Sequence, residues 1–375
     1  MIIMGAMHWC KLGVALIASM YLFICLTIWY STGSVSLSNL KQANITGRWR
    51  RALQGGYHKI VEPNVSQSVI WERQQMSRKQ LLQDRCVAFK AKADTFDPPL
   101  RYEANSWRRF PREFIVIEPL KVVYCTIPKV SSTTILRMLL NVTGLLPPNP
   151  RPRILVSNNF SSLDRYELGE AEKILATYKK FLFVRNPLER FLSAYRNKVE
   201  TNVDPAFEVL RDFIRSSNGR AKLVKKTREI KRSSMTNHLT VQESNVTFSQ
   251  FAKFVLSGRE KAFQRARPGM NKHWRPMYEI CQPCLVDYDW IGHLESLQTD
   301  ICSILRALVG GNRTVYVPKH YPRHVTDSSA EDTQSYFFAT LKFPQIEALI
   351  KYYELDYDLF GFDIPPSIGK LINNG

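Results

Sequence analysis

A lysine and a run of hydroxyl side chains follow an apolar segment, Val122–Cys125, in the first half of the chain. The residues at this turn are Pro128, Lys129, Val130, Ser131, Ser132, Thr133 and Thr134. The pattern predicts a buried strand, a tight turn and the start of a helix. Because the N–H groups and the dipole of a helix N-terminus attract phosphate, the turn predicts an anion site. Its spacing differs from the Gly-rich Walker A loop.

A second apolar segment, Phe181–Val184, ends in Arg185, and Ser193 follows on the next predicted helix. Open α/β sheets bind ligands at the carboxyl ends of their strands. A guanidinium there can hold a phosphate through two hydrogen bonds, and Ser193 can reach the same group. Arg190 is expected either to assist or to pair with an acid such as Glu189. The residues of this predicted site are Arg185, Asn186, Pro187, Leu188, Glu189, Arg190, Phe191, Leu192 and Ser193.

In this order, the two segments resemble the 5′-phosphosulfate loop and the 3′-phosphate segment of sulfotransferases that use 3′-phosphoadenylyl sulfate (PAPS). The stretches IPKVSSTT and FVRNPLERFLSAYRNK are similar to the Golgi carbohydrate sulfotransferases of the chondroitin, dermatan, N-acetylgalactosamine 4-O- and HNK-1 group. Chondroitin 4-O-sulfotransferase is the most similar of these, and the resemblance covers roughly residues 115–362, including the stretch from Asn271 to Gly292. Many relatives have Asn-Trp-Lys at Thr134–Leu136 and Asp at Asn186, which leaves the acceptor open.

The resemblance implies a chemistry for the site. PAPS would donate a sulfuryl group, without a metal ion, to the 4-position of N-acetylgalactosamine in a glycosaminoglycan such as chondroitin. Lys129 would stabilise the leaving phosphate. His273 is the predicted general base, beside an aromatic residue, Trp274, able to stack on a sugar. Other candidates for the base are His293 and Glu295, followed by His238, His320 and His324.

Other acceptors and one other class of protein stay open. The alternative acceptors are terminal N-acetylgalactosamine of N-glycans, dermatan and a glucuronyl group of the HNK-1 type. A Golgi glycan-binding protein that does not transfer sulfate is the alternative outside the enzymes.

Strand-like and helical segments alternate along the chain, which predicts an α/β class with a mostly parallel central sheet flanked by helices. The resemblance implies a P-loop-like sulfotransferase fold. The predicted strands are Glu118–Ile127, Phe181–Val184 and Leu285–Leu294. The predicted helices are Thr133–Leu140, Leu163–Lys180, Pro187–Val199, one capped by Thr247 with a core stripe of phenylalanines, Leu297–Val309 and Gln345–Tyr353.

Residues 12–30 are nearly all apolar and uncharged, and are long enough to span a bilayer. We predict an uncleaved signal anchor, with a cleaved secretory signal as the alternative. The predicted organisation is a cytosolic tail at 1–11, the span at 12–30, a luminal stem at 31–113 with a helix near Glu72–Phe89, and a catalytic domain at 114–375. The basic residues beyond the span oppose this orientation, but large domains translocate largely regardless of charge.

Glycosylation sequons support a luminal location. All of them follow the apolar span, at Asn44, Asn64, Asn141, Asn159, Asn245 and Asn312. N-glycans are expected at these positions. Together with the resemblance, they predict a single-pass type II protein of the Golgi membrane.

The cysteines after the span fit an oxidising compartment. They are Cys86, Cys125, Cys281, Cys284 and Cys302. Because their number is odd, at least one thiol is free or pairs between chains. The Cys281-x-x-Cys284 pair lacks the partner ligands of a zinc site and precedes a strand, unlike a redox motif. We predict a structural disulfide, within this pair or from one member to Cys86 or Cys302.

The formal net charge of the chain is +19. Nine basic and two acidic residues lie between Arg211 and Arg232. Such an excess suits polyanions, and an exported glycoprotein does not normally meet nucleic acid. We therefore expect the partners to be PAPS and an anionic glycosaminoglycan.

Overall fold

The computed structural model describes part of the chain. The ranges are 57–59, 65–93, 112–145, 160–201, 205–216, 245–267, 269–310, 316–318 and 326–373. The chain divides into two compact units, and the description below concerns the second, His58–Gly375. Within the described ranges, none of the helices combines the length and the apolar character needed to cross a membrane. The anchor predicted at 12–30 lies outside these ranges.

A five-stranded sheet in the order β4-β2-β3-β5-β6 lies at the centre of this unit. Its strands are β2 (Phe114–Ile117), β3 (Val122–Cys125), β4 (Ser161–Ser162), β5 (Lys179–Val184) and β6 (Trp290–His293). β3, β5 and β6 are parallel, whereas β2 pairs antiparallel with both β3 and β4. The predicted α/β class is correct, but the sheet is mixed. The carboxyl ends of the three parallel strands lie at one edge, where the two predicted phosphate segments begin.

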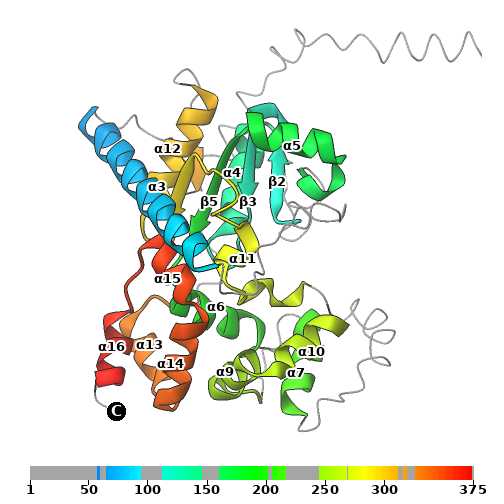
Figure 1. Cartoon of the computed structure of the whole chain (residues 1–375), viewed down its shortest axis with the longest axis vertical. Helices are drawn as coiled ribbons and strands as arrows, with labels where there is room; N and C mark the ends of the chain where they lie inside the picture. The colour runs from blue at the N-terminus through cyan, green and yellow to red at the C-terminus, as the bar shows by residue number, and fades with distance from the viewer. Residues whose placement is uncertain are drawn as a thin grey trace, which may run out of the picture. The chain divides into compact units, whose positions relative to one another are not determined.

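Thirteen α-helices are described. They are α3 (Val65–Ala93), α4 (Ser132–Val142), α5 (Leu168–Thr177), α6 (Pro187–Lys198), α7 (Glu208–Arg215), α9 (Phe248–Leu256), α10 (Gly258–Ala266), α11 (Met277–Cys281), α12 (Leu297–Val309), α13 (Glu331–Phe338), α14 (Phe343–Tyr352), α15 (Glu354–Phe360) and α16 (Pro366–Asn373). Figure 1 shows α4, α5 and α12 beside the strands, with α7, α9, α10, α13, α14 and α16 in the lower part of the view. One hydrophobic core joins the sheet to α4, α11 and α12, and a second joins α6 to α9 and α14. A separate two-stranded sheet pairs β1 (Tyr57–Lys59) with β7 (Tyr316–Pro318).

Three predicted elements are longer than the observed ones. The predicted strand Glu118–Ile127 begins with a 3-10 turn, Glu118–Leu120, because Pro119 fixes φ and lacks an N–H for the sheet. The predicted helix Leu163–Lys180 shrinks to α5, since Lys179 already belongs to β5. The predicted strand Leu285–Leu294 shrinks to β6, because the N–H of Leu285 closes a turn onto Gln282.

The structure pairs four of the cysteines. Cys86 on α3 bonds to Cys284, and Cys125 at the end of β3 bonds to Cys281. Among the described cysteines, Cys302 is a buried free thiol, so the predicted odd thiol is confirmed. The first pair is one of the predicted possibilities. The second corrects the prediction, because Cys125 was not considered as a partner.

Candidate functional site

The predicted phosphate loop connects β3 to α4, and two of its residues have left-handed backbones. Lys129 has a φ of 74°, and Ser131, the N-cap of α4, has a φ of 60°. For residues other than glycine, this conformation costs about 1–3 kcal/mol and persists only where neighbours hold it. Arg190 Nε donates to the carbonyl oxygen of Pro128 at 3.0 Å, and Arg185 Nη1 donates to that of Lys129 at 3.3 Å. Two arginines of the second segment therefore hold consecutive carbonyls of the first.

The hydroxyl residues of the first segment lie at the start of α4. Thr133 is exposed, while Ser131, Ser132 and Thr134 are half-buried. The side chain of Ser131 does not cap the helix. Because the first N–H groups of a helix have no partner within it, this end of α4 presents backbone and hydroxyl donors beside Lys129. Val130 is instead fully buried and belongs to the core.

Arg185 lies in a cluster of hydroxyl groups that the sequence did not predict. Its Nη2 donates to Ser328 Oγ at 3.0 Å and to Ser329 Oγ at 2.8 Å, and its Nε donates to Glu189 at 3.3 Å. The side chain is buried, and burial lowers the pKa of Arg185 while the Glu189 charge opposes this shift. The guanidinium is thus held in a fixed orientation at the carboxyl end of β5.

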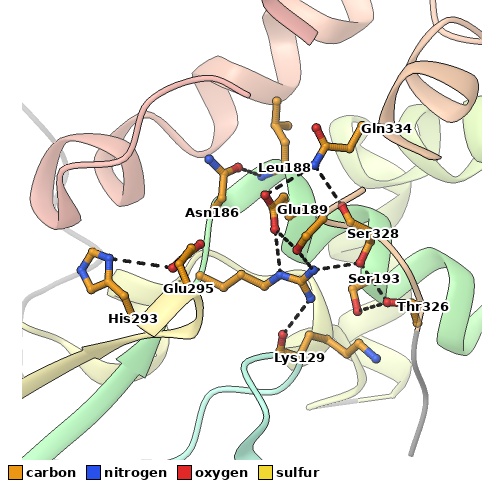
Figure 2. Close-up of polar contacts among 12 residues, drawn as sticks. Lys129, Asn186, Leu188, Glu189, Ser193, His293, Glu295, Thr326, Ser328 and Gln334 are labelled. Carbon is orange, nitrogen blue, oxygen red and sulfur yellow. Dashed lines mark hydrogen bonds and ion pairs between the residues drawn. The ribbon is translucent and has the colours of Figure 1, made fainter. Parts of the chain in front are cut away.

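Ser193 belongs to the same cluster. Its hydroxyl lies 2.9 Å from Thr326 Oγ1, which in turn lies 2.8 Å from Ser328 Oγ. Figure 2 shows Ser193, Thr326 and Ser328 together on one side of the site, with Lys129 nearby. The only sequence signal for this loop is the run Thr326-Asp327-Ser328-Ser329, which is too common to identify a site.

Lys129 has an unusual electrostatic environment. Burial, followed by the charges of Lys198, Arg185 and Arg190, lowers the pKa of Lys129 from 10.5 to about 7. Its half-buried ammonium therefore lies among other cations. Such a group gains strongly from an anionic ligand, because the ligand replaces the lost hydration and offsets the like charges.

His273 lies close enough to Lys129 to be affected by its charge. Burial, then the charges of Lys198 and Lys129, lower the pKa of His273 well below its usual value. The Nδ1 atom of His273 is buried without a hydrogen-bond partner among the described residues, and its ring meets that of Phe207 edge to face at 5.3 Å. The lowered pKa favours the neutral imidazole, which is the form able to accept a proton, and also makes it a weaker base. Trp274 is fully buried, so it cannot stack on a sugar as predicted.

His293 and Glu295 lie apart from Lys129, at the end of β6. His293 Nδ1 lies 4.0 Å from Glu295, on the side of the site opposite Ser193 (Figure 2). Burial lowers the pKa of His293 to about 4, and burial raises the pKa of Glu295. The structure thus brings His273, rather than these two, to the electrostatic environment of Lys129. The other predicted histidines, His238, His320 and His324, lie outside the described residues.

The other residues of the second segment cap α6 or pack in the hydrophobic core. Asn186 caps α6 by accepting from the N–H of Leu188 at 3.2 Å, and its side chain donates to the carbonyl of Asp363 at 2.8 Å. The first residue of α6 is Pro187. Buried core residues are Leu188, Phe191 and Leu192. Arg190 does not pair with Glu189 in this structure, and donates to backbone carbonyls instead.

Comparison with known proteins identifies the family of the chain. Residues 112–363 match the sulfotransferase family, so the chain belongs to that family, as the sequence predicted. It is 29% identical to carbohydrate sulfotransferase 12 of Mus musculus, over 79% of this chain and 70% of the relative. It is 27% identical to carbohydrate sulfotransferase 11 of Rattus norvegicus over 68% of each chain. It is also 27% identical to carbohydrate sulfotransferase 8 of Homo sapiens, over 78% of this chain and 63% of the relative. No solved structure matches the chain significantly.

Proposed function

We propose that the chain transfers a sulfuryl group from PAPS to a hydroxyl group of a glycan. One observation carries the proposal: Arg185 of the predicted 3′-phosphate segment donates to the backbone of Lys129 in the predicted 5′-phosphosulfate loop. Two segments that were predicted separately to bind the two ends of one nucleotide are therefore in contact, which supports their belonging to one site.

The donor would be held by cations and hydroxyl groups. The start of α4, with Lys129 and the side chains of Ser132, Thr133 and Thr134, would bind the 5′-phosphosulfate. Arg185 and Ser193 would bind the 3′-phosphate. The loop hydroxyls of Thr326, Ser328 and Ser329 now hold the Arg185–Ser193 pair and are placed to exchange these bonds for phosphate oxygens. Within the described residues, no cluster of His, Cys, Asp or Glu could hold a metal ion.

In the transfer step, the acceptor oxygen forms a bond to sulfur as the bond between sulfur and the bridging phosphate oxygen breaks. The hydroxyl proton passes to His273. Lys129 stabilises the negative charge on the departing adenosine 3′,5′-bisphosphate (PAP), so charge develops where a cation is already placed. No covalent enzyme intermediate is required.

The acceptor we propose is the 4-position of N-acetylgalactosamine in chondroitin. The net charge of +19 supports an anionic glycan, and the relatives are carbohydrate sulfotransferases. Terminal N-acetylgalactosamine of N-glycans, dermatan and a glucuronyl acceptor are the alternatives within the same chemistry.

The proposed location is the Golgi membrane, with residues 12–30 as a type II anchor. The two disulfides support an oxidising lumen. Of the predicted glycosylation sites, Asn245 is exposed and Asn141 is half-buried on α4. The sequons at 44, 64, 159 and 312 lie outside the described residues.

Transfer of radiolabelled sulfate from PAPS by a secreted fragment, residues 40–375, tests the proposal. The acceptors are desulfated chondroitin, dermatan, heparosan and oligosaccharides that end in N-acetylgalactosamine. Lys129→Ala is expected to lower kcat by about 100–1,000-fold, because it removes a charge that acts in the transition state. Lys351→Ala, which alters an exposed lysine paired with Glu354, is the matched control.

The label decides between the functions. Label on chondroitin at the 4-position, lost in Lys129→Ala, would support the full proposal. Label on another acceptor would keep the chemistry and replace the substrate. Binding of PAP without transfer to any acceptor would instead support a glycan-binding protein that has lost activity.

A further inference from the structure

Arg190 is a fully buried arginine that links three segments of the site. Its Nε donates to the carbonyl of Pro128 at 3.0 Å, its Nη1 to that of Arg275 at 2.8 Å, and its Nη2 to that of Lys272 at 2.8 Å. Pro128 directly precedes Lys129, while Lys272 and Arg275 flank the segment that carries His273. One planar group thus bonds both to the predicted donor loop and to the segment that carries the predicted base.

Burying this charged side chain costs free energy of folding. Burial without a directly bonded carboxylate forfeits the hydration of this guanidinium and lowers the pKa of Arg190, while the charges of Tyr353 and Asp356 oppose this shift. Within the part of the chain that is described, all its hydrogen bonds go to backbone carbonyls. A carbonyl partner makes Arg190 sensitive to the position of the backbone, not to the identity of a side chain. A lysine could not reproduce it, because only a guanidinium offers a rigid fork of donors.

We propose that Arg190 is a positioning residue, which sets the Lys129 loop and the His273 segment at the separation that sulfuryl transfer needs. The inference rests on the proposed function and adds a role for a residue whose hydrogen bonds, among the described residues, go to backbone carbonyls. Lys129 acts on the leaving oxygen and His273 on the attacking one, and these oxygens lie on opposite sides of the sulfur. Their relative position is therefore the geometric variable of an in-line transfer.

The left-handed backbone of Lys129 gives this role a physical basis. The loop is strained, and the arginine pair Arg185 and Arg190 holds its two consecutive carbonyls. Arg185 also belongs to the predicted 3′-phosphate site, whereas Arg190 connects the loop to the base. Loss of Arg190 would leave Arg185 and the predicted 3′-phosphate site in place, and would free the Lys129 loop to shift relative to His273.

The test compares Arg190→Lys and Arg190→Gln with Arg259→Lys in the 40–375 fragment. Arg259 is the matched control, because it also donates to two backbone carbonyls, those of Phe213 and Ser216, each at 2.6 Å. Three quantities are measured: amide hydrogen exchange in peptides covering 126–131 and 270–276, the Kd of PAP by calorimetry, and kcat and KM for transfer.

We expect faster exchange in both peptides at once in the Arg190 variants, and in neither peptide in Arg259→Lys. We expect kcat to fall about 100-fold, since a displacement near 1 Å can cost that much, with the Kd of PAP within about threefold of the unmodified fragment. A KM effect with unchanged kcat, unchanged exchange in either peptide, or failure of both variants to fold would overturn the proposal.

The exchange measurement separates this proposal from the function itself. If the unmodified fragment binds no PAP and transfers no sulfate, the proposed function fails. Coupled exchange of the two peptides would then still show that Arg190 holds them together, and the positioning role in sulfuryl transfer would be rejected on the kinetic result alone.

Discussion

Lys129 combines a function that needs a charge with surroundings that disfavour it. Its pKa of about 7 results first from burial and next from Lys198. A bound phosphosulfate would supply the missing counter-charge and return the pKa toward its usual value. Donor binding should therefore be coupled to the uptake of a proton above pH 7.

We predict that the affinity for PAP falls above pH 7, by up to about tenfold per pH unit. The phosphates of PAP lose their last proton near pH 6, so they do not cause a decrease above pH 7. Lys198→Met should move the onset of the decrease to higher pH, because it removes a like charge beside Lys129. Calorimetry at several pH values, in buffers of different ionisation enthalpy, measures both affinity and proton uptake. An affinity constant from pH 7 to 9 would contradict this prediction.

The sequence predicted those candidate-site residues that lie within one motif, and missed the residues that the fold brings in from elsewhere. Lys129, Arg185 and Ser193 follow strands in recognisable contexts. Thr326 approaches Ser193 across a separation of 133 residues, and no local pattern encodes that contact. Arg190 was predicted to be a possible phosphate ligand because it lies in the segment from Arg185 to Ser193. Only the fold shows that it donates to backbone carbonyls.

At the scale of elements, α3 covers the free edge of the sheet. β6 is the last strand in the sheet order, and Gln75 of α3 bonds with both the N–H and the carbonyl of Ile291. Figure 1 shows α3 passing beside α15, which it contacts. An amide side chain thereby satisfies strand groups that would otherwise be open to another strand.

Asp300 of α12 also holds α3 in place through hydrogen bonds. The fully buried carboxylate accepts from Trp71 Nε1 at 3.0 Å and from Arg78 Nη1 at 2.9 Å. We predict that Asp300→Ala lowers the free energy of unfolding by about 3–5 kcal/mol, because the variant deprives Arg78, whose side chain is only 12% exposed, of its carboxylate and leaves the indole N–H of Trp71 unpaired. Urea unfolding followed by circular dichroism measures the loss.

Asp287→Ala provides the comparison for that measurement. Asp287 is exposed and lies 3.9 Å from Lys79, also of α3, so its removal should change stability by less than about 1 kcal/mol. Equal effects of the two substitutions would mean that α3 is not held through Asp300.

Elements with their own local signals were predicted well. The bounds of α12 agree with the predicted Leu297–Val309, and Thr247 caps α9 as expected. The helix expected near Glu72–Phe89 is also present, as part of α3. Its tertiary role was not foreseen, because Gln75 and Arg78 are typical of a solvent-facing surface and only their partners show that they face inward.

At the scale of the whole molecule, two disulfides join distant parts of the chain to the Cys281-x-x-Cys284 segment. One links Cys125, directly before the donor loop, across a separation of 156 residues, and the other links Cys86 of α3 across 198. The predicted connectivity stayed open because spacing along the chain does not determine which cysteines meet. The two disulfides therefore connect α3 and β3 to the same short segment.

The family match begins at residue 112, so a fragment chosen from it would omit α3 and Cys86. We predict that fragment 112–375 is secreted poorly and melts well below fragment 58–375, since it exposes the edge of β6 and leaves Cys284 as a free thiol.

The double variant Cys86→Ser/Cys284→Ser in fragment 58–375 keeps α3 and removes only the disulfide, at an expected cost of about 2–5 kcal/mol. Its Tm should therefore lie between those of the two fragments. Thermal unfolding with thiol titration measures this order. If fragments 112–375 and 58–375 have the same Tm, α3 does not stabilise the catalytic domain. The intermediate Tm would instead show that α3 stabilises the domain through its own contacts with β6 and α12 as well as through the disulfide.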